Sequence, residues 1–481
     1  MAQPGESATT RAPVSPSPKP SRWTRAAHQS PDAKAGGEPA GDLRWQRLLL
    51  TPYHSALALI FLLAVALRVI YNLTIARNYV PLHDAADYNN MALHLLREGC
   101  LCISPHIPTT VRPPLFPLFL ANVYAVTGYD PLHARLALSV VGALTCLLVA
   151  DMARILMGHR LALVAGLIAA TYPQLFIWDA WLYSESLAIF FFALCCYLCM
   201  RLQKRRQWWV WLGVGLIFGL AALVRPNGIY ALLAVIAVVA LAVVLRETPR
   251  RSGAIQIVAL TLGCLLVLAP WVVRNFVVTG GAFVPFTTVS GIVVAGSYND
   301  ESFSNPVWHG TWVNPLSVPA DAPTMERFPV ICDARCEVAR DNAANQLGVH
   351  WAETHIRELP LLFYRRMKVF WHPDSPPGEA GMPVWRPFAS AYPTAVILLA
   401  FLGMLVALAR RWRAALLPLL FAAMVLVGGL LFYGSPRMRA PMEPMLVVFA
   451  AVAVVWLFDL ARRGVMRTWM RARGNRGSAP Q

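Results

Sequence analysis

Long runs of apolar residues dominate this sequence, and polar residues gather in the segments between them. A helix needs about 17–25 mostly apolar residues to cross the hydrocarbon core of a membrane. The runs are continuous and lack the alternation of barrel strands, so they favour membrane-spanning helices. The stretches lie at about 53–75, 133–157, 161–178, 184–200, 208–224, 228–245, 255–273, 393–409, 414–433 and 441–460. The pattern predicts an all-α polytopic membrane protein with about ten transmembrane helices.

The composition supports the same class of protein. Of the 481 residues, 57% are hydrophobic and only 14% are charged. Ordinary soluble domains carry about a quarter charged residues. The composition therefore excludes an ordinary soluble globular protein.

The formal net charge of +17 comes largely from short basic segments between the apolar runs. Cytoplasmic loops of membrane proteins are enriched in Lys and Arg in this way, so we expect no nucleic-acid partner. With ten spans, the basic clusters all lie on one side of the membrane, which places both termini in the cytoplasm. These clusters are residues 201–206, 246–251, 410–413 and 462–476.

The same pattern divides the chain into parts. Residues 1–40 are rich in Pro, Ser, Ala and Gly and show no apolar periodicity, which is typical of disordered tails. Two outer segments are too long to be simple turns. The predicted division is a disordered cytoplasmic tail at 1–50, an N-terminal transmembrane domain at 51–273 that includes the first outer loop at 76–132, a large outer loop at 274–392, C-terminal transmembrane helices at 393–461 and a basic cytoplasmic tail at 462–481.

The nine cysteines show no zinc-binding pattern. Five lie in apolar runs, where cysteine behaves as a small hydrophobic residue. Cys332 and Cys336 lie in the large outer loop and form a disulfide if the compartment is oxidising. A regular helix would hold the two sulfurs in poor bridging geometry, so the sequence leaves this pairing open.

Asp84 and Asp87 follow the first apolar run in the first outer loop. Side chains three residues apart share one face of a helix. A carboxylate there can accept the proton of an attacking hydroxyl or amine, or coordinate a cation. The alternative is that Asp84 caps the next helix, because Asp is a preferred N-cap, and the two roles are compatible.

Several arginines lie at the predicted outer ends of apolar runs, against the positive-inside bias. Each one alone is explained by snorkelling or topology. Together they suggest an anionic ligand, because the planar guanidinium fork pairs well with phosphate. They are Arg112, Arg225, Arg274, Arg437 and Arg439. Glu185 begins the fourth apolar run on the same side. It is either an acid stabilised by the helix dipole or a second acid of a polar cavity that contacts substrate or metal.

Six segments then follow one another in a recognisable order: Asp84…Asp87-Tyr88, Val111-Arg112-Pro113-Pro114, Ser184-Glu185-Ser186-Leu187, Arg225-Pro226-Asn227-Gly228, Pro270-Trp271-Val272-Val273-Arg274-Asn275 and Arg437-Met438-Arg439-Ala440-Pro441-Met442-Glu443-Pro444. This order resembles bacterial GT-C glycosyltransferases. It is most similar to the family that includes the lipid A aminoarabinose transferase, protein O-mannosyltransferases and Rgt-type lipopolysaccharide sugar transferases. The resemblance covers most of residues 55–460.

The resemblance implies a multi-pass enzyme of the bacterial inner membrane with a periplasmic active site. Such an enzyme moves a hexosyl or pentosyl group from a polyprenyl-phosphate donor to lipid A, lipopolysaccharide, another glycan or a protein. The family's first-loop acid falls on Asp84, the candidate general base of an inverting transfer. Many members have Asp-Glu there, whereas this chain has Asp84-Ala85, so Asp87 remains a second candidate.

The other expected roles follow from these motifs. Arg225, Arg274, Arg437 and Arg439 are candidates to bind the donor phosphate. The expected substrate cavity contains Tyr88, Arg112, Glu185, Asn227 and Glu443. The motifs indicate no definite cofactor, and a divalent cation held by Asp84, Asp87 and Glu185 is compatible with the pattern.

Two other functions are compatible with a lipid-phosphate site in a membrane protein. A transporter or flippase for lipid-linked glycans would more often show repeat symmetry and charges deep within its helices. An enzyme similar to O-antigen ligases would use a pyrophosphate-linked donor. The polar groups here gather at one face and in two long outer loops, which favours an enzyme working at that surface.

Overall fold

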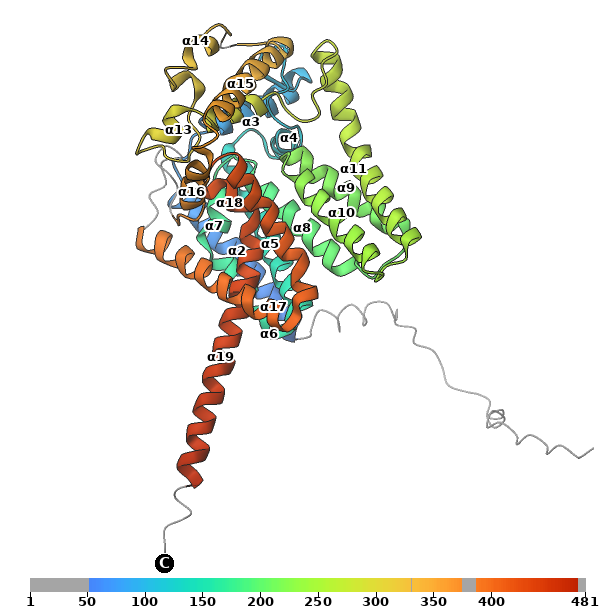
Figure 1. Cartoon of the computed structure of the whole chain (residues 1–481), viewed down its shortest axis with the longest axis vertical. Coiled ribbons are helices and arrows are strands. Elements are labelled where there is room, and N and C mark those ends of the chain that lie inside the picture. Colours follow the sequence, from blue (N-terminus) through green and yellow to red (C-terminus); the bar gives the residue numbers. More distant parts are fainter. Residues whose placement is uncertain (1–51, 330, 374–385, 475–481) are drawn as a thin grey trace, which may run out of the picture. The chain divides into compact units, whose positions relative to one another are not determined.

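The computed structural model describes residues 52–329, 331–373 and 386–474, and the side chains of 386–389 and 465–474 are not described. The tail expected at residues 1–50 lies outside this range, as does the last part of the expected C-terminal tail. Almost all regular structure in the described part is helical (Figure 1).

The apolar helices follow the expected stretches closely. They and the short turns that continue them are α2 (Pro52–Leu73), α5 (Pro131–Met157), α6 (His159–Thr171), α7 (Pro173–Phe176), η1 (Ile177–Ala180), α8 (Glu185–Leu202), α9 (Trp208–Val224), α10 (Gly228–Val244), α11 (Arg250–Val278), α17 (Arg386–Leu431), α18 (Pro436–Arg439), η3 (Ala440–Met442) and α19 (Glu443–Gly474).

Among the described residues, six helices are long and apolar enough to cross a membrane. A seventh span results if α6 is counted together with α7 and η1, from which it is bent by 68°. This is fewer than the ten spans expected. The difference arises because α9 and α10 have only 17 residues each and α17 merges two expected spans across a kink at Arg411.

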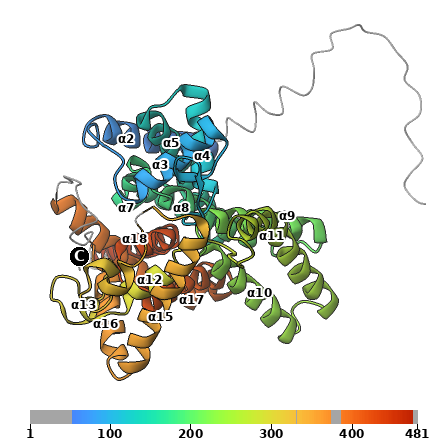
Figure 2. The same ribbon diagram turned by 90° about the horizontal axis from the view of Figure 1, so that it is seen from above.

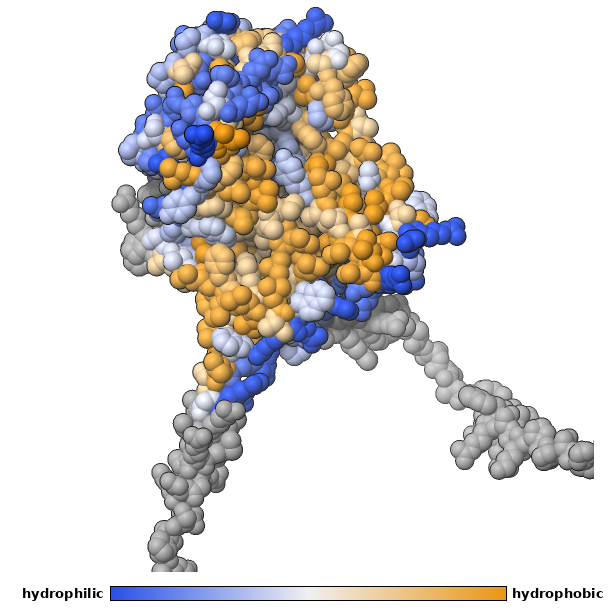
Figure 3. Space-filling model, in the orientation of Figure 1, coloured by the Kyte–Doolittle hydropathy of each residue, from blue (hydrophilic) through white to orange (hydrophobic). Residues whose placement is uncertain are grey.

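The apolar surface forms a band around these helices. Figure 3 shows hydrophobic residues over α9, α10, α11 and α17, with hydrophilic residues above the band near α13 to α15 and below it where the helices end. Many apolar side chains in the band are exposed, including Leu233 on α10 and Leu265 on α11. Such a band is the surface that a lipid bilayer covers.

The helices α9 and α11 pack closely through glycine. A Cβ atom placed on Gly215 would collide with the backbone carbonyl of Leu260, and one on Gly263 would collide with that of Leu212. Membrane helices approach each other in this way where small residues face the neighbouring backbone. The sequence therefore brings these two helices together without a polar contact.

The two long segments that the sequence predicts on the outer side carry the remaining elements. The first contains α3 (Asp84–Glu98), the antiparallel strands β1 (Cys102–Ser104) and β2 (Ile107–Pro108), and α4 (Leu115–Thr127). The second contains α12 (Ser290–Ser297), α13 (Asp300–Ser304), η2 (Pro315–Ser317), α14 (Ala322–Met325), α15 (Ala334–Thr354) and α16 (Leu359–Phe370). In the view from above, α12 to α16 group together beside the end of the bundle that carries α18 (Figure 2).

Two disulfides lie in these outer segments. Cys332 is bonded to Cys336, a pairing that the sequence left open. The bridge is possible because Cys332 precedes α15, so that only Cys336 is helical. A second bridge, between Cys100 and Cys102, was not expected. The five cysteines in apolar helices are free and buried, as predicted.

Candidate active site

The starts of α3 and α8 meet α18 and the segment that precedes α4 (Figure 2). Helix α3 begins at Asp84, and the residue before it, His83, has a backbone φ of 51°. Positive φ is costly for residues other than glycine, and such strain is often found at functional sites. The strained turn presents the first acid of α3 to the arginines around it.

Asp84 is held by two arginines from distant parts of the chain. The Nη2 of Arg112 donates to Oδ1 at 2.5 Å, and the Nη2 of Arg437 donates to Oδ2 at 2.7 Å. The N-cap position of α3 is occupied by His83, and Asp84 is the first helical residue. The capping role considered for Asp84 is therefore wrong, because both carboxylate oxygens are engaged by guanidinium groups instead.

Asp87 shares the first of these arginines. The Nη2 and Nε of Arg112 donate to its Oδ2 at 2.9 and 3.2 Å. The two aspartates thus lie on one helical face, as their spacing predicted. Pro113 and Pro114 follow Arg112 and end the extended segment at the start of α4, which fixes the position of this arginine.

Glu185 is fully buried at the first position of α8. Its Oε1 accepts hydrogen bonds from Arg225 Nη1 and from Arg437 Nε. Its Oε2 is buried without a hydrogen-bond partner among the described residues. Arg437 therefore bridges Asp84 and Glu185. We call this set the acid–arginine cluster, in which the three carboxylates of Asp84, Asp87 and Glu185 balance the formal charge of Arg112, Arg225 and Arg437.

Local sequence explains where the two outer arginines lie. Arg225 follows the last residue of α9 and precedes Pro226, which cannot continue the helix. Arg437 lies in α18, where the side chain of Ser435 accepts a hydrogen bond from the Arg437 backbone N–H and Pro436 opens the helix. Both side chains retain some exposure, 19% for Arg225 and 14% for Arg437, so a ligand can reach them.

Two tyrosines complete the cluster. The Tyr88 hydroxyl donates to Ser184 Oγ at 3.2 Å, and the Arg112 guanidinium lies 5.5 Å from the Tyr88 ring centre. The Arg437 guanidinium lies 4.4 Å from the ring centre of Tyr183. Tyr183 was not among the predicted site residues, although its position two residues before Glu185 could have indicated it.

The two aspartates differ in their electrostatic surroundings. Burial alone would raise the pKa of Asp84, but the charges of Arg112 and Arg437 outweigh burial and hold the pKa well below its usual range. Burial raises the pKa of Asp87, and its one arginine offsets only part of that rise. Asp84 is therefore the more firmly ionised of the two.

The remaining predicted residues lie outside this ion-pair cluster. Arg274 donates to the backbone oxygens of Thr109 at 2.6 Å and Leu101 at 3.3 Å. Arg439 is fully buried and pairs with Glu443 at 2.6 Å. Asn227 is partly buried before α10, and its side chain makes no capping hydrogen bond.

The acids of the cluster do not suit a metal ion. Asp84, Asp87 and Glu185 each pair with arginine where a cation would bind. In the described part of the chain, no group of three or more His, Cys, Asp or Glu side chains could hold a metal. We therefore assign no step of a reaction to a metal ion.

Sequence reasoning missed a buried ion pair behind the cluster. Arg68 of α2 donates through Nε to Asp179 Oδ2 at 2.7 Å, and the Ser186 hydroxyl donates to the other oxygen of Asp179. Ser186 adjoins Glu185, so this pair supports the start of α8. A charged residue within an apolar run is costly and was the signal that could have identified Arg68.

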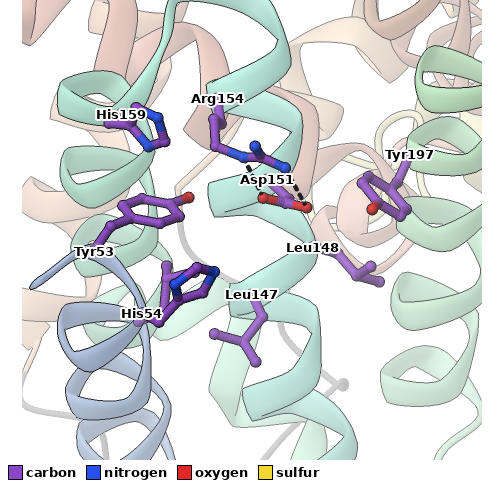
Figure 4. Close-up of a pocket in the computed structure, with 9 residues that line it drawn as sticks. Tyr53, His54, Leu147, Leu148, Asp151, Arg154, His159 and Tyr197 are labelled. Atoms are coloured by element: carbon purple, nitrogen blue, oxygen red, sulfur yellow. Dashed lines mark hydrogen bonds and ion pairs between the residues drawn. The ribbon is translucent and has the colours of Figure 1, made fainter. Parts of the chain in front are cut away.

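A separate cavity of about 320 Å³ lies where α2 and α6 begin and α5 ends (Figure 4). Its lining includes Tyr53, His54, Leu148, Asp151, Arg154 and Tyr197. Tyr197 is twelve residues along α8 from Glu185, which corresponds to about 18 Å. None of the predicted site residues lines this cavity, so it is distinct from the acid–arginine cluster.

Residues 111–273 match the family model described as dolichyl-phosphate-mannose-protein mannosyltransferase. The structure is similar to crystal structures of the oligosaccharyltransferase of Archaeoglobus fulgidus. For the form tethered with an acceptor peptide, the sequence identity is 13% and the TM-score 0.53, covering 86% of this chain and 50% of that chain. For the apo form, the identity is 13% and the TM-score 0.52, covering 89% of this chain and 52% of that chain. This chain has the GT-C fold.

The chain spans about half the length of these GT-C structures. It is also similar to ArnT from Cupriavidus metallidurans bound to undecaprenyl phosphate, at 13% identity and a TM-score of 0.38, covering 82% of this chain and 76% of that chain. No curated protein matches the sequence significantly. The GT-C resemblance expected from the motifs is confirmed, and the matched segment contains Arg112, Glu185 and Arg225.

Proposed function

We propose that this protein is a membrane glycosyltransferase that moves a sugar from a polyprenyl-phosphate donor to an extracytoplasmic acceptor. The observation that carries the proposal is the cluster in which Arg437 bridges Asp84 and Glu185. It combines a carboxylate base with cations suited to a phosphate leaving group. The GT-C fold and the description of the matched family, which names a dolichyl-phosphate donor, support the same class of donor.

Arg225 and Arg437 are the proposed ligands of the donor phosphate. Both donate to the buried Glu185 and both remain partly exposed. A phosphate can replace a carboxylate as the partner of a guanidinium group without leaving the charge unpaired. Arg274 donates to backbone carbonyls, and Arg439 pairs with Glu443. We therefore assign both arginines a supporting role around the phosphate site.

Asp84 is the proposed general base. A general base must reach the acceptor hydroxyl or amine as it attacks the anomeric carbon, so it must lie close to the site of the donor phosphate. In the described structure the Asp84 carboxylate contacts Arg437, whereas the Asp87 carboxylate pairs with Arg112 alone. Asp84 takes the proton from the acceptor hydroxyl or amine, whose oxygen or nitrogen forms a bond to the anomeric carbon. The bond from that carbon to the phosphate oxygen breaks, and polyprenyl phosphate leaves with the electron pair. The configuration at the anomeric carbon inverts.

Binding of the donor makes Asp84 a stronger base. In the structure, two guanidinium groups lower its pKa and so weaken it as a proton acceptor. A phosphate at Arg437 competes for that guanidinium and removes one of the two charges from Asp84. The acceptor is therefore deprotonated only when the donor is in place, and the same arginine stabilises the charge that develops on the leaving phosphate.

The remaining cavity residues are proposed to shape the acceptor side. Tyr88 and Arg112 lie next to both aspartates, and Asn227 lies two residues beyond Arg225. Glu443 is enclosed by Arg439 and by the Tyr172 hydroxyl, which donates to it at 3.0 Å, so we propose that it orders this wall of the cavity.

We also propose ten membrane crossings, with both termini in the cytoplasm of a bacterium and the cluster on the outer face of its inner membrane. Ten results when α9, α10, the two halves of α17 and the bent pair of α6 with α7 and η1 are each counted as a span beside the other five helices. The basic residues 246–251 and 410–413 then lie on the side opposite to the cluster. On this topology, residues 76–132 and 274–392 are the two periplasmic loops, between transmembrane parts at 51–273 and 393–461.

Deletion of the gene tests the function in cells. The mass of lipid A, lipopolysaccharide, another glycan or a protein should decrease by one sugar after deletion. Expression of the wild-type chain should restore the mass, and expression of Asp84→Asn should not. A flippase would need no general base, so full restoration by Asp84→Asn would contradict a transferase.

A further inference from the structure

The two outer loops meet at the carboxylate of Glu337, an acid in the first turn of α15. Its Oε2 accepts hydrogen bonds from the Thr110 backbone N–H at 2.8 Å, the Thr110 hydroxyl at 2.9 Å and the Thr288 hydroxyl at 3.1 Å. The Thr109 hydroxyl donates to Oε1. Glu337 is only 3% exposed, so the acid is almost entirely committed to these contacts.

The segment held by Glu337 leads directly to the acid–arginine cluster. Two residues after Thr110, Arg112 forms ion pairs with Asp84 and Asp87. The same segment is fastened from the other side, because Arg274 donates to the Thr109 backbone oxygen. Residues 109–112 are therefore fixed at one end by the second outer loop and at the other by the aspartates of the cluster.

The position of Glu337 is itself fixed by the start of α15. The side chain of Asp333 accepts a hydrogen bond from the Cys336 backbone N–H at 2.8 Å and caps the helix. The bridge between Cys332 and Cys336 joins the residue before this cap to the first turn. A helix start that is both capped and bridged holds an acid in its first turn with little freedom.

We propose that Glu337 is a positioning residue of the active site, which acts by holding residues 109–112 so that Arg112 reaches Asp84 and Asp87. The inference rests on the proposed transferase function for its kinetic consequence, whereas the contact itself does not depend on that function. Glu337 need not touch either substrate. Through it, the fold of the large outer loop sets the charge around the general base.

The charged groups around this path determine the direction of the effect. Asp84 faces Arg112, Arg437 and, at longer range, Arg225, and Asp87 faces Arg112 and Asp84. Arg274 lies within electrostatic range of Glu337 and donates to the backbone of the same segment. If residues 109–112 loosen, Arg112 withdraws from the aspartates and less positive charge opposes the protonation of Asp84. The acid side of the activity profile then moves to higher pH.

The test compares Glu337→Gln with the matched control Asp341→Asn in the full-length protein in lipid nanodiscs. Asp341 also lies on α15 and also holds outer-loop backbone, but its partners are the N–H groups of Gly291 at 2.7 Å and Ile292 at 3.2 Å. Hydrogen–deuterium exchange is measured for a peptide covering residues 101–114. The pH profile of kcat/KM is measured for transfer from a polyprenyl-phosphate sugar.

Glu337→Gln should speed exchange in residues 101–114, lower kcat/KM by about tenfold to a hundredfold and move the acid limb to higher pH. Asp341→Asn should leave that exchange and that limb as in the wild type. Thr110→Val, which retains the carboxylate, should give a smaller change in the same direction even if Glu337→Gln folds poorly. Unchanged exchange, or faster exchange with an unchanged acid limb, overturns the inference. If the wild type transfers no sugar, the proposed function fails, while faster exchange in Glu337→Gln still supports the contact.

Discussion

Arg437 donates to Asp84 across 353 residues of sequence, at a distance of 2.7 Å. The same guanidinium also donates to the buried Glu185. One side chain from the last part of the chain thus joins an acid at the start of α3 to an acid at the start of α8. A donor phosphate that binds Arg437 would act on both acids, and the first predictions concern this bridge.

Replacing Arg437 by lysine should lower kcat by about a hundredfold, because an ammonium group cannot contact Asp84 and Glu185 with the geometry of the planar fork. Steady-state transfer kinetics with the polyprenyl-phosphate donor measure this loss. Arg413→Lys is a suitable control, since Arg413 is exposed and its contacts in the described structure are with Glu247 and the neighbouring Trp412 ring, far along the chain from the acids of the cluster. A kcat of Arg437→Lys equal to that of the wild type would remove the bridge from the mechanism.

The acid limb of kcat should lie at higher pH than the acid limb of kcat/KM. In the free enzyme, Arg112 and Arg437 hold the pKa of Asp84 below its usual value of about 3.9, so activity is lost only as the pH falls below that value. In the complex with donor, Arg437 turns to the phosphate and the pKa of Asp84 rises. The pH profile of kcat/KM reports the pKa of Asp84 in the free enzyme, and the pH profile of kcat reports its pKa in the complex with donor. Comparing the two profiles therefore measures the rise. Coinciding limbs would argue against this exchange of partners.

Glu185→Gln should destabilise the protein by about 3 kcal/mol, because it leaves Arg225 and Arg437 without their shared carboxylate. A phosphate-bearing ligand can restore the missing negative charge. Polyprenyl phosphate should therefore raise the Tm of Glu185→Gln by more than it raises the Tm of the wild type. Thermal unfolding in nanodiscs with and without the lipid measures both values, and an equal shift in the two proteins would contradict a phosphate site at these arginines.

The outer loops should be accessible from the periplasm. A membrane-impermeant maleimide should label Cys332 and Cys336 in whole spheroplasts only after treatment with an impermeant reductant, because the two are bonded to each other. Mass spectrometry of the labelled peptide measures this. Labelling that requires permeabilised membranes would place the loops, and the cluster with them, on the cytoplasmic side.

Much of this site could be predicted from local sequence. The acids of α3 share a face because they are three residues apart, and motif order indicated Arg112, Glu185 and Arg225. Local sequence could not separate Arg437 from Arg439. These residues are two positions apart, yet one bridges the acids of the cluster and the other is buried against Glu443. That choice depends on how α18 packs against α3 and α8.

Other features depended on tertiary contacts that leave no local pattern. Glu337 looks like an ordinary first-turn acid of a helix, and only the fold brings it to Thr109 and Thr110. By contrast, the two breaks in the apolar helices have local signals: the kink at Arg411 lies in the basic stretch 410–413 that separated two predicted spans, and α7 begins at Pro173, which cannot continue the preceding helix.

The most direct test is sugar transfer by the purified protein from a radiolabelled polyprenyl-phosphate donor. Asp84→Asn and Asp87→Asn are compared with Asp151→Asn, an acid that also pairs with an arginine but lies in the separate cavity on α5. Asp84→Asn should abolish measurable transfer, Asp87→Asn should lower it strongly, and both should still bind the donor lipid. Asp151→Asn should transfer as the wild type does. Normal turnover by both Asp84→Asn and Asp87→Asn would contradict the assignment of the acid–arginine cluster as the active site.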